Sequence, residues 1–533
     1  MAPHAAQNGT SPIHTREKDL PGGWVVLKFG GTSVGKFARN IADIVQTGVS
    51  KNRIAIVCSA RSTTVKAEGT TNRLLRTARA AEKANSRDYD PIVETIRADH
   101  VQAARDLIKD PAILDALIQD ITFECKTLTK ILESAQHLEE VSARVEDKII
   151  SKGEKLSCRF MTALLQDQGV KAQYVDMSDV IKVSIHHGGV DEVFYEHVAA
   201  TLADEVLACG DAVPVITGFF GSVPGGLLPT IGRGYTDLCA ALVAVGLKAA
   251  RQPVSELQIW KEVDGIFTAD PRKVPTAALL DTVTPSEAAE LTFYGSEVIH
   301  PFTMEQVIRA RIPIRIKNVI NPRNNGTMIF PDAIDEITQK NPLHGAHLTH
   351  LVRTRSNSGR GAIQRPKRPT AVTIKRGIVV LNVHSNKRTR AHGFLMSIFS
   401  TLDKWHLSVD LISSSEVHVS MALHSESPML ANGGSADVVQ VIDEDLKCAI
   451  VELQRIGTVD LVNEMAIVSL VGKQLKNMVG ISGRFFSVLG DEGINIEMIS
   501  QGASEINISC VIEEREADRA LNVVHTNLFT FLD

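Results

Sequence analysis

The first three hundred residues alternate short apolar runs with longer stretches of helical periodicity, and this rhythm limits the fold more than any other feature. Strands that are apolar along their whole length are buried on both faces, as in a parallel sheet with helices on each side. Residues 24–330 therefore predict an α/β domain, and residues 86–150 are predicted to form several of its helices. The apolar runs are WVVLKF (24–29), IAIVCS (54–59), AQYVDM (172–177), AVPVITGF (212–219), LQIW (257–260) and IPIRIKN (312–318).

The chain is too long for one domain, since a domain has roughly 150 residues. With 533 residues, about three domains are expected. Residues 1–22 contain no apolar run and are predicted to be a flexible tail before an α/β domain at 23–330. Residues 331–370 are rich in basic residues, Gly, Ser and Pro, which favours a solvated linker over an anion-binding patch.

The C-terminal part contains an internal repeat. The segment GFLMSIFSTLDKWHLSVDLISSSEVHVSMAL aligns with GRFFSVLGDEGINIEMISQGASEINISCVI. Each copy reads as helix, strand, turn, strand, and the alternating strands before both copies and a second helix after the first complete two βαββαβ units, at 371–456 and 457–533. The paired apolar residues are expected to be core: Phe399 with Phe486, Leu402 with Leu489, Leu407 with Ile494, and Ile412 with Ile499.

Charge and cysteine content exclude several functions. A formal net charge of −5 gives no basic footprint for nucleic acid. The seven cysteines are scattered without a C-x-x-C pair, so neither a disulfide framework nor a zinc site is predicted, and no dedicated metal site is expected. No apolar stretch reaches the roughly 18 residues of a membrane span. We expect a cytoplasmic protein that binds neither nucleic acid nor membrane.

The stretch VVLKFGGTSVGK places a lysine and two glycines at the end of the first strand. Lys28 would bring a positive charge beside the unshielded backbone N–H groups of Gly30 and Gly31, while Thr32 and Ser33 add hydroxyl donors. A helix predicted to start near residue 35 would add its positive end. The lysine precedes the glycines, unlike in a Walker motif, so this is a different phosphate site. The alternative is an edge lysine followed by a simple turn.

Three further stretches are weaker when taken singly. TIGRGYTDLC offers Arg233 for a carboxylate and Asp237 for a magnesium ion or bridging water, or only a helix start. WKEVDGIFTADPRKVP reads equally well as a nucleotide loop or a polar surface loop. IISKGEKLSCRF predicts a helix that starts near Glu154, whose carboxylate could hold an ammonium group or simply belong to the first turn.

Together these stretches resemble the aspartate kinases of the amino-acid kinase family, in the monofunctional form with two ACT domains. The motifs KFGGTSV, GEKLS, GRGYTD, WKEVDGIFTADPR, ELTFYGSEVIHPFTMEQVIRARIPIRIKN and NPRNNGT occur in the family's order. The spellings GRGYTD and WKEVDG are typical of fungal members. The resemblance implies an αβα sandwich kinase domain followed by two α+β ferredoxin-like ACT domains.

The resemblance also implies an activity. ATP and L-aspartate would give 4-phospho-L-aspartate and ADP with Mg²⁺, the first step towards threonine, methionine and isoleucine. The β-carboxylate is already ionised at neutral pH, so no general base is needed, and the main barrier is repulsion between two anions. A catalytically inactive amino-acid sensor that keeps its ACT domains is the alternative.

By motif position, the resemblance assigns three sets of residues. For catalysis it implies Lys28, Asp237 and Arg233. For aspartate it implies Ser59, Thr71, Glu154 and Arg233, although the segment from Ser59 to Thr71 is longer than in bacterial relatives. For ATP it implies Lys28, Gly30, Gly31, Thr32, Ser33, Asp237, Lys261, Glu262, Phe267, Arg272, Glu297 and Val298.

ACT domains bind amino acids in the turns after their first strands and pair with one another. The resemblance therefore implies feedback inhibition, with L-threonine as the expected effector, and a homo-oligomer formed through the ACT domains. The effector residues would be His392, Gly393, Ser413, Ser414, Ser415 and Glu416. The alternative is that the repeats only dimerise the chain.

Overall fold

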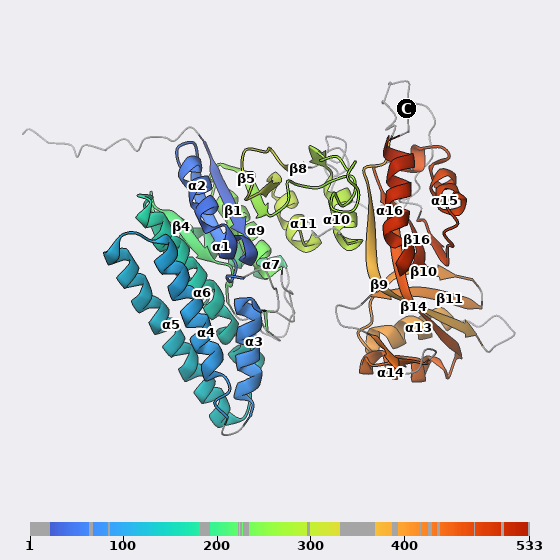
Figure 1. The fold of residues 1–533 in the computed structure, drawn as a ribbon, viewed down its shortest axis with the longest axis horizontal. Helices are drawn as coiled ribbons and strands as arrows, with labels where there is room; N and C mark the ends of the chain where they lie inside the picture. Colours follow the sequence, from blue (N-terminus) through green and yellow to red (C-terminus); the bar gives the residue numbers. More distant parts are fainter. Residues whose placement is uncertain are drawn as a thin grey trace, which may run out of the picture.

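The computed structural model describes a defined part of the chain, in which an α/β domain lies beside a C-terminal sheet (Figure 1). The described residues are 22–62, 68–83, 86–181, 192–221, 223, 226–227, 234–295, 299–330, 368–385, 393–415, 417–424, 429–433, 438–473, 475–502 and 506–530. Of the predicted linker, only residues 368–370 lie among them, and almost the whole predicted tail lies outside them.

The α/β domain is built on an eight-stranded sheet in the order β3-β4-β2-β1-β5-β7-β8-β6. Its pairs are parallel except β7 with β8, which confirms the predicted mostly parallel sheet. The strands are β1 (Trp24–Phe29), β2 (Arg53–Cys58), β3 (Ala172–Val175), β4 (Val213–Thr217), β5 (Val254–Lys261), β6 (Thr282–Val283), β7 (Ile314–Asn318) and β8 (Thr327–Ile329).

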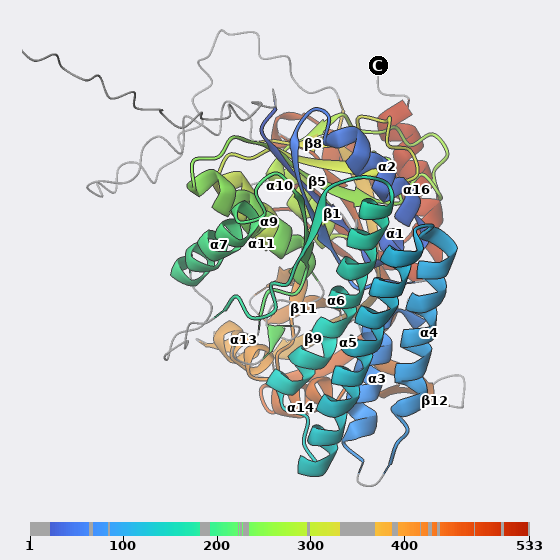
Figure 2. The same ribbon diagram turned by 90° about the vertical axis from the view of Figure 1, so that its left-hand side faces the viewer.

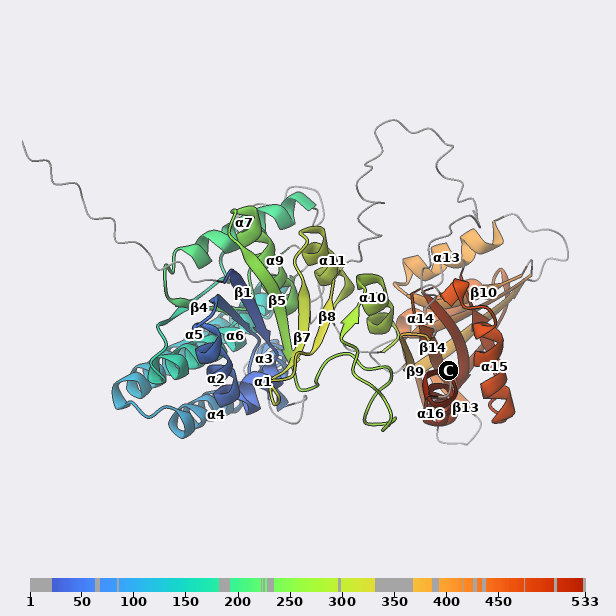
Figure 3. The ribbon, with the colours of Figure 1, turned by 90° about the horizontal axis from the view of Figure 1, so that it is seen from above.

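Helices cover both faces of this sheet, as Figure 3 shows from above. One layer contains α1 (Gly31–Lys36), α2 (Ala38–Gly48), α3 (Thr70–Ala81), α4 (Asp90–Leu107), α5 (Pro111–Leu138) and α6 (Ala143–Asp167). The other contains α7 (Glu192–Leu207), α9 (Tyr235–Ala249), α10 (Pro285–Phe293) and α11 (Pro301–Arg309). The predicted αβα sandwich is therefore confirmed.

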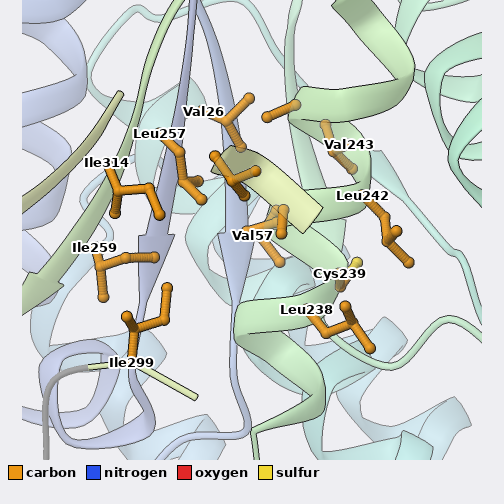
Figure 4. Packing of buried hydrophobic residues seen from close by; sticks show 14 of the residues in the cluster. Val26, Val57, Leu238, Cys239, Leu242, Val243, Leu257, Ile259, Ile299 and Ile314 are labelled. Atoms are coloured by element: carbon orange, nitrogen blue, oxygen red, sulfur yellow. The ribbon is translucent and has the colours of Figure 1, made fainter. Parts of the chain in front are cut away.

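Side-chain alternation along β1 feeds both cores. Val25 and Leu27 pack into the layer of α1 to α6, while Trp24 and Val26 pack into the layer of α7 and α9. Figure 4 shows Val26 among side chains of the second core, where Leu238, Leu242 and Val243 of α9 meet Val57 and Leu257 of the neighbouring strands. The two cores hold β1 at the centre of the domain, so its C-terminal end has a fixed position.

The C-terminal part forms a six-stranded antiparallel sheet in the order β10-β11-β9-β14-β16-β15. Its strands are β9 (Ala371–Ser385), β10 (Val409–Ser414), β11 (His418–His424), β14 (Gly457–Val471), β15 (Met498–Ser500) and β16 (Asn507–Glu513). Its helices are α13 (Phe394–Lys404), α14 (Glu444–Leu453), α15 (Ile481–Asp491) and α16 (Ala517–His525), and a separate hairpin joins β12 (Leu430–Gly433) to β13 (Val438–Val441).

The two long strands β9 and β14 are shared between the two repeated units, and they run the length of the sheet in Figure 1. Residues 378–385 of β9 pair with residues 457–465 of β14 beside α13 and α14. Residues 371–375 pair with residues 467–471 beside α15 and α16. The second unit is thus not continuous in sequence, because one of its strands is the start of β9, residues 371–375. The rest of the first unit lies between this strand and the remainder of the second unit in the chain.

The expectation that the paired apolar residues of the repeat are core is wrong for three of them. Leu402 and Leu489 are buried as expected. Phe399, Ile412 and Ile499, however, are 42%, 37% and 47% exposed. The buried side chains are those one position earlier, at Ile398, Leu411 and Met498. Leu411 and Met498 occupy equivalent positions and are both buried, so the register of the alignment holds and the error lies in which residues were expected to face the core. On β10 and β15 neighbouring residues face opposite sides of the sheet, so a choice one residue away selects the exposed side.

Helix α10 connects the α/β domain to the C-terminal sheet, between the two in Figure 3. Its N-cap Thr284 and Glu287 form a capping box. The same buried Glu287 carboxylate accepts hydrogen bonds from the Thr370 hydroxyl and the Lys473 N–H, both at 2.6 Å. One carboxylate therefore caps the helix and holds two C-terminal strands to the α/β domain.

Two predicted absences can be compared with the described residues. All seven cysteines lie among them and are unpaired, and six are buried. None of the described helices combines the length and apolarity needed to cross a membrane.

Candidate functional site

The C-terminal ends of β1, β2 and β5 meet the start of α9, and most of the predicted site residues lie there; Figure 2 shows α9 beside β1 and β5. Lys28, the penultimate residue of β1, extends its ammonium to the first turn of α9. Its Nζ lies 2.8 Å from Oδ1 of Asp237. The side chains are only 12% and 14% exposed, so the ion pair is largely shielded from water.

The glycines after β1 are required by close backbone packing. A Cβ on Gly31 would lie 2.2 Å from the Ala60 carbonyl oxygen, which excludes a side chain. A Cβ on Gly30 would instead meet only the Lys28 Nζ, at 3.9 Å, so a side chain there would occupy the space beside the ammonium. Helix α1 begins at Gly31, so the prediction that a helix starts near residue 35 is wrong by about one turn.

Ser33 and Glu262, two predicted ATP residues, are brought together. The Ser33 hydroxyl is buried and donates to Glu262 Oε1 at 2.7 Å, which ties α1 to the segment after β5. Lys261 ends β5, and its carbonyl accepts from the Val319 N–H. Thr32 is half-buried in the first turn of α1.

The loop that carries Phe267 and Arg272 also reaches the C-terminal sheet. Phe267 pairs with Leu279 across the loop, and Arg272, 84% exposed, forms a bidentate ion pair with Asp270. Thr268 of this loop contacts His525 of α16 at 2.8 Å. Lys273 pairs with Asp518 of the same helix. A loop predicted to hold the nucleotide is therefore also a contact of the second repeated unit.

Glu154 lies fully buried in the middle of α6, which begins at Ala143, so the prediction that a helix starts near Glu154 is wrong by about three turns and Glu154 is not a first-turn residue. Its Oε1 accepts a hydrogen bond from the Tyr235 hydroxyl at 2.5 Å and a longer one from the Ala60 N–H at 3.4 Å. Its Oε2 is buried without a hydrogen-bond partner in the described part of the chain. Burial raises the pKa of Glu154 to about 7, although both hydrogen bonds act to lower it.

The two predicted aspartate-side hydroxyls belong to residues adjacent in sequence to Ala60 and Thr70, which pack against α6 beside Glu154. Ser59, after β2, accepts a hydrogen bond from the Thr236 hydroxyl at 3.4 Å. Thr71 lies half-buried in the first turn of α3, next to Thr70, whose N–H bonds the Arg61 carbonyl. A Cβ at Gly153 would press on Ala60 and Thr70, so α3, α6 and the end of β2 pack closely around Glu154.

Five predicted site residues lie outside the described residues: Arg233, Glu297, Val298, His392 and Glu416. Of the predicted effector residues, Gly393 caps α13 with a φ of 89°. Ser413 and Ser414 end β10, and Ser415 forms a turn with His418. Strands β9 and β10 are both antiparallel to β11, so the C-terminal end of β9 and the serines lie at the same end of the sheet.

Sequence reasoning missed Tyr235 and Thr236 as members of the site. Both were read only as part of a motif, yet they are buried and hydrogen-bonded to Glu154 and Ser59. The available signal was their position in the first turn of a helix that begins directly after a glycine turn, where side chains face the preceding strand ends.

Comparison with known proteins identifies the family of the chain. Residues 23–318 match the amino acid kinase family, and residues 468–528 match an ACT domain. The aspartokinase of Schizosaccharomyces pombe is 54% identical over 513 residues, covering 96% of this chain and 94% of the relative. The chain belongs to the aspartokinase family. The aspartokinase of Saccharomyces cerevisiae is 50% identical, with 95% of this chain and 93% of that protein covered.

Solved structures of this family show the same architecture. Escherichia coli aspartokinase III in complex with aspartate and ADP, called the R-state, is 27% identical with a TM-score of 0.69. The match covers 95% of this chain and 99% of that one. The same bacterial enzyme in complex with lysine and aspartate, called the T-state, is 28% identical with the same TM-score and coverage. The expected fold class, an αβα kinase domain followed by ACT-type units, is confirmed.

Proposed function

We propose that this chain is an aspartate kinase, which transfers the γ-phosphoryl group of ATP to the β-carboxylate of L-aspartate and releases ADP and 4-phospho-L-aspartate. The observation that carries the proposal is the shielded pair of Lys28 with Asp237 at the end of β1, beside the open space at Gly30. Relatives with at least half of their residues identical bear the same activity in their names.

The residue types suit this chemistry. Both reactants are anions, so the enzyme must lower their repulsion and align them, and it needs no base for a carboxylate that is already ionised. The Lys28 ammonium would neutralise the oxygens of the transferring phosphoryl group, and the unshielded N–H groups beside Gly30 would add donors. Glu154 would hold the aspartate ammonium, and Ser59, Thr71 and Arg233 would contact the rest of that substrate.

The site fits a nucleotide with a magnesium ion. The space at Gly30 adjoins a cation, and Asp237 supplies one carboxylate, which suits a metal that takes its remaining ligands from phosphates and water. No group of three or more His, Cys, Asp or Glu side chains within the described residues forms a dedicated metal cage. When bound, Mg²⁺ supplies positive charge to the phosphate oxygens. The further ATP contacts are proposed at Gly31, Thr32, Ser33, Lys261, Glu262, Phe267, Arg272, Glu297 and Val298.

A coupled assay of ADP formation tests the activity. The full-length chain with ATP and Mg²⁺ should form ADP only when L-aspartate is present, and hydroxylamine should trap the acyl phosphate. ADP formation that is the same without aspartate, or none at all, would instead favour an amino-acid sensor that has lost catalysis.

We further propose that the ACT units at 371–456 and 457–533 bind L-threonine and assemble a cytoplasmic homo-oligomer, in a pathway towards threonine, methionine and isoleucine. Exposed apolar side chains at Leu395, Met396 and Phe399 on α13 support a protein contact. The effector would bind at His392, Gly393 and the turn from Ser413 to Glu416. Kinase assays with threonine, lysine and methionine test this, since three flat curves would leave only the assembly role.

A further inference from the structure

Glu154 cannot hold a substrate ammonium unless its carboxylate is ionised and one oxygen is left open. Glu154 has no solvent exposure, and a buried charge without a partner is costly, so burial opposes the ionised state. A buried oxygen without a hydrogen-bond partner is costly for the same reason. Two donors reach the carboxylate, and both bind Oε1. Oε2 remains buried and unpartnered among the described residues, as an acceptor for a ligand requires.

The shorter of these two hydrogen bonds comes from Tyr235. Its hydroxyl lies 2.5 Å from Oε1, compared with 3.4 Å for the Ala60 N–H. The tyrosine itself is held firmly, since it is only 3% exposed, follows Gly234 as the first residue of α9, and packs edge-on against Phe219. Its hydroxyl is therefore a donor with a fixed position, and it donates to one of the two carboxylate oxygens of Glu154.

We propose that Tyr235 is a positioning residue for aspartate binding, which donates to Oε1 of Glu154 and so presents Oε2 to the ammonium group of the amino-acid substrate. This inference rests on the proposed function. It assigns Tyr235 no contact with ATP or with the reacting carboxylate, so the hydroxyl should affect aspartate binding and leave phosphoryl transfer unchanged.

The Tyr235→Phe variant removes only the hydroxyl. A hydrogen bond to a charged group is lost, so the KM for aspartate should rise about ten-fold or more. The kcat at saturating aspartate and the KM for ATP should stay within about two-fold of wild type. Tyr195→Phe is the matched control, because Tyr195 is a buried tyrosine on α7 that carries no proposed role, and all three constants should stay at wild-type values.

The pH profile separates positioning from a general packing effect. The Tyr235 hydrogen bond acts to lower the pKa of Glu154, so its loss should move the fall in KM for aspartate to higher pH. Within the described ranges, the other titratable groups that interact with Glu154 are the buried thiols of Cys158 and Cys239, whose pKa values are raised by burial, so neither ionises between pH 6 and pH 8. An unshifted profile would overturn the proposal.

A double variant gives a second, independent test. Glu154→Gln should itself raise the KM for aspartate, and adding Tyr235→Phe should change the KM no further, since the tyrosine acts through the glutamate. Additive effects, a lower kcat for Tyr235→Phe, or an unchanged KM would each refute the role of Tyr235. An active wild-type enzyme with an unchanged Tyr235→Phe variant would refute only this inference, whereas a wild type without aspartate-dependent turnover would refute the proposed function as well.

Discussion

The burial of Glu154 makes a prediction about stability that does not depend on any substrate. Its pKa is raised from 4.5 to about 7 by burial. Because the folded pKa lies above the unfolded one, the native state binds a proton at Glu154 more tightly than the unfolded chain does. This contribution to the unfolding free energy is complete below pH 4.5 and is lost as pH rises to about 7. The shift of about 2.5 pKa units corresponds to ~3 kcal/mol, at about 1.36 kcal/mol per unit.

Glu154→Gln removes this penalty, because the amide stays neutral while its oxygen still accepts from Tyr235. Between pH 5.5 and pH 8 the variant should gain about 2 kcal/mol in unfolding free energy relative to wild type, since the wild type loses about 1.36 kcal/mol per unit up to its folded pKa. Urea unfolding followed by tryptophan fluorescence suits the measurement, since Trp24 and Trp260 are buried in the kinase domain. Glu196→Gln, at an exposed position on α7, is the control.

Two results would refute this reasoning. One is a stability difference between wild type and Glu154→Gln that stays constant from pH 5.5 to pH 8. The other is a wild type that becomes relatively more stable as pH rises. Either would mean that the carboxylate is ionised in the free enzyme, and that its burial imposes no cost for a substrate ammonium to offset.

The remaining predictions concern catalysis, the contact between the α/β domain and the C-terminal sheet, and an ion pair within that sheet. Lys28→Ala should lower kcat by about 10²–10³-fold with an unchanged circular dichroism spectrum, because it removes one donor to the transferring phosphoryl group; near-normal turnover would contradict the role. Glu287→Ala should lower the unfolding free energy by about 2–3 kcal/mol in urea titrations, because it leaves the Thr284 N–H at the start of α10, the Thr370 hydroxyl and the Lys473 N–H without an acceptor. Asp410→Ala should cost about 3–5 kcal/mol, because it leaves Lys375, 2.6 Å away and 14% exposed, without its partner, and no change in the urea midpoint would contradict the buried pair.

The sequence was sufficient for the parts of the fold that local pattern determines. Apolar runs gave the strands at 24–29, 172–175 and 213–217 to within a few residues, because a strand covered on both faces has few polar positions. The short strands β6 and β8 were not predicted, since two or three residues carry no periodic signal. The sharing of β9 and β14 could not be predicted either, because it depends on pairing between residues far apart in the chain.

The candidate site also divides into residues that the local sequence predicts and residues whose surroundings depend on tertiary structure. The glycines and Lys28 could be chosen because their residue types and spacing suit an anion, and Asp237 because a carboxylate suits the magnesium ion that accompanies a nucleotide. The burial of Glu154 could not, since a glutamate within a charged helical segment ordinarily faces water, and only the packing of α6 beneath Ala60 and Tyr235 removes it from solvent. The loop at Arg272 was read as a nucleotide contact, while its contact with α16 depends on tertiary structure.

The central claim is that Lys28, held by Asp237 at the end of β1, neutralises the phosphoryl group that is transferred to aspartate. A crystal structure of the full-length chain with Mg²⁺, a non-hydrolysable ATP analogue and L-aspartate tests it most directly. The account predicts a γ-phosphate oxygen about 3 Å from the Lys28 Nζ, with the aspartate ammonium at Oε2 of Glu154. A triphosphate bound away from the end of β1, with Lys28 still paired only to Asp237, would contradict it.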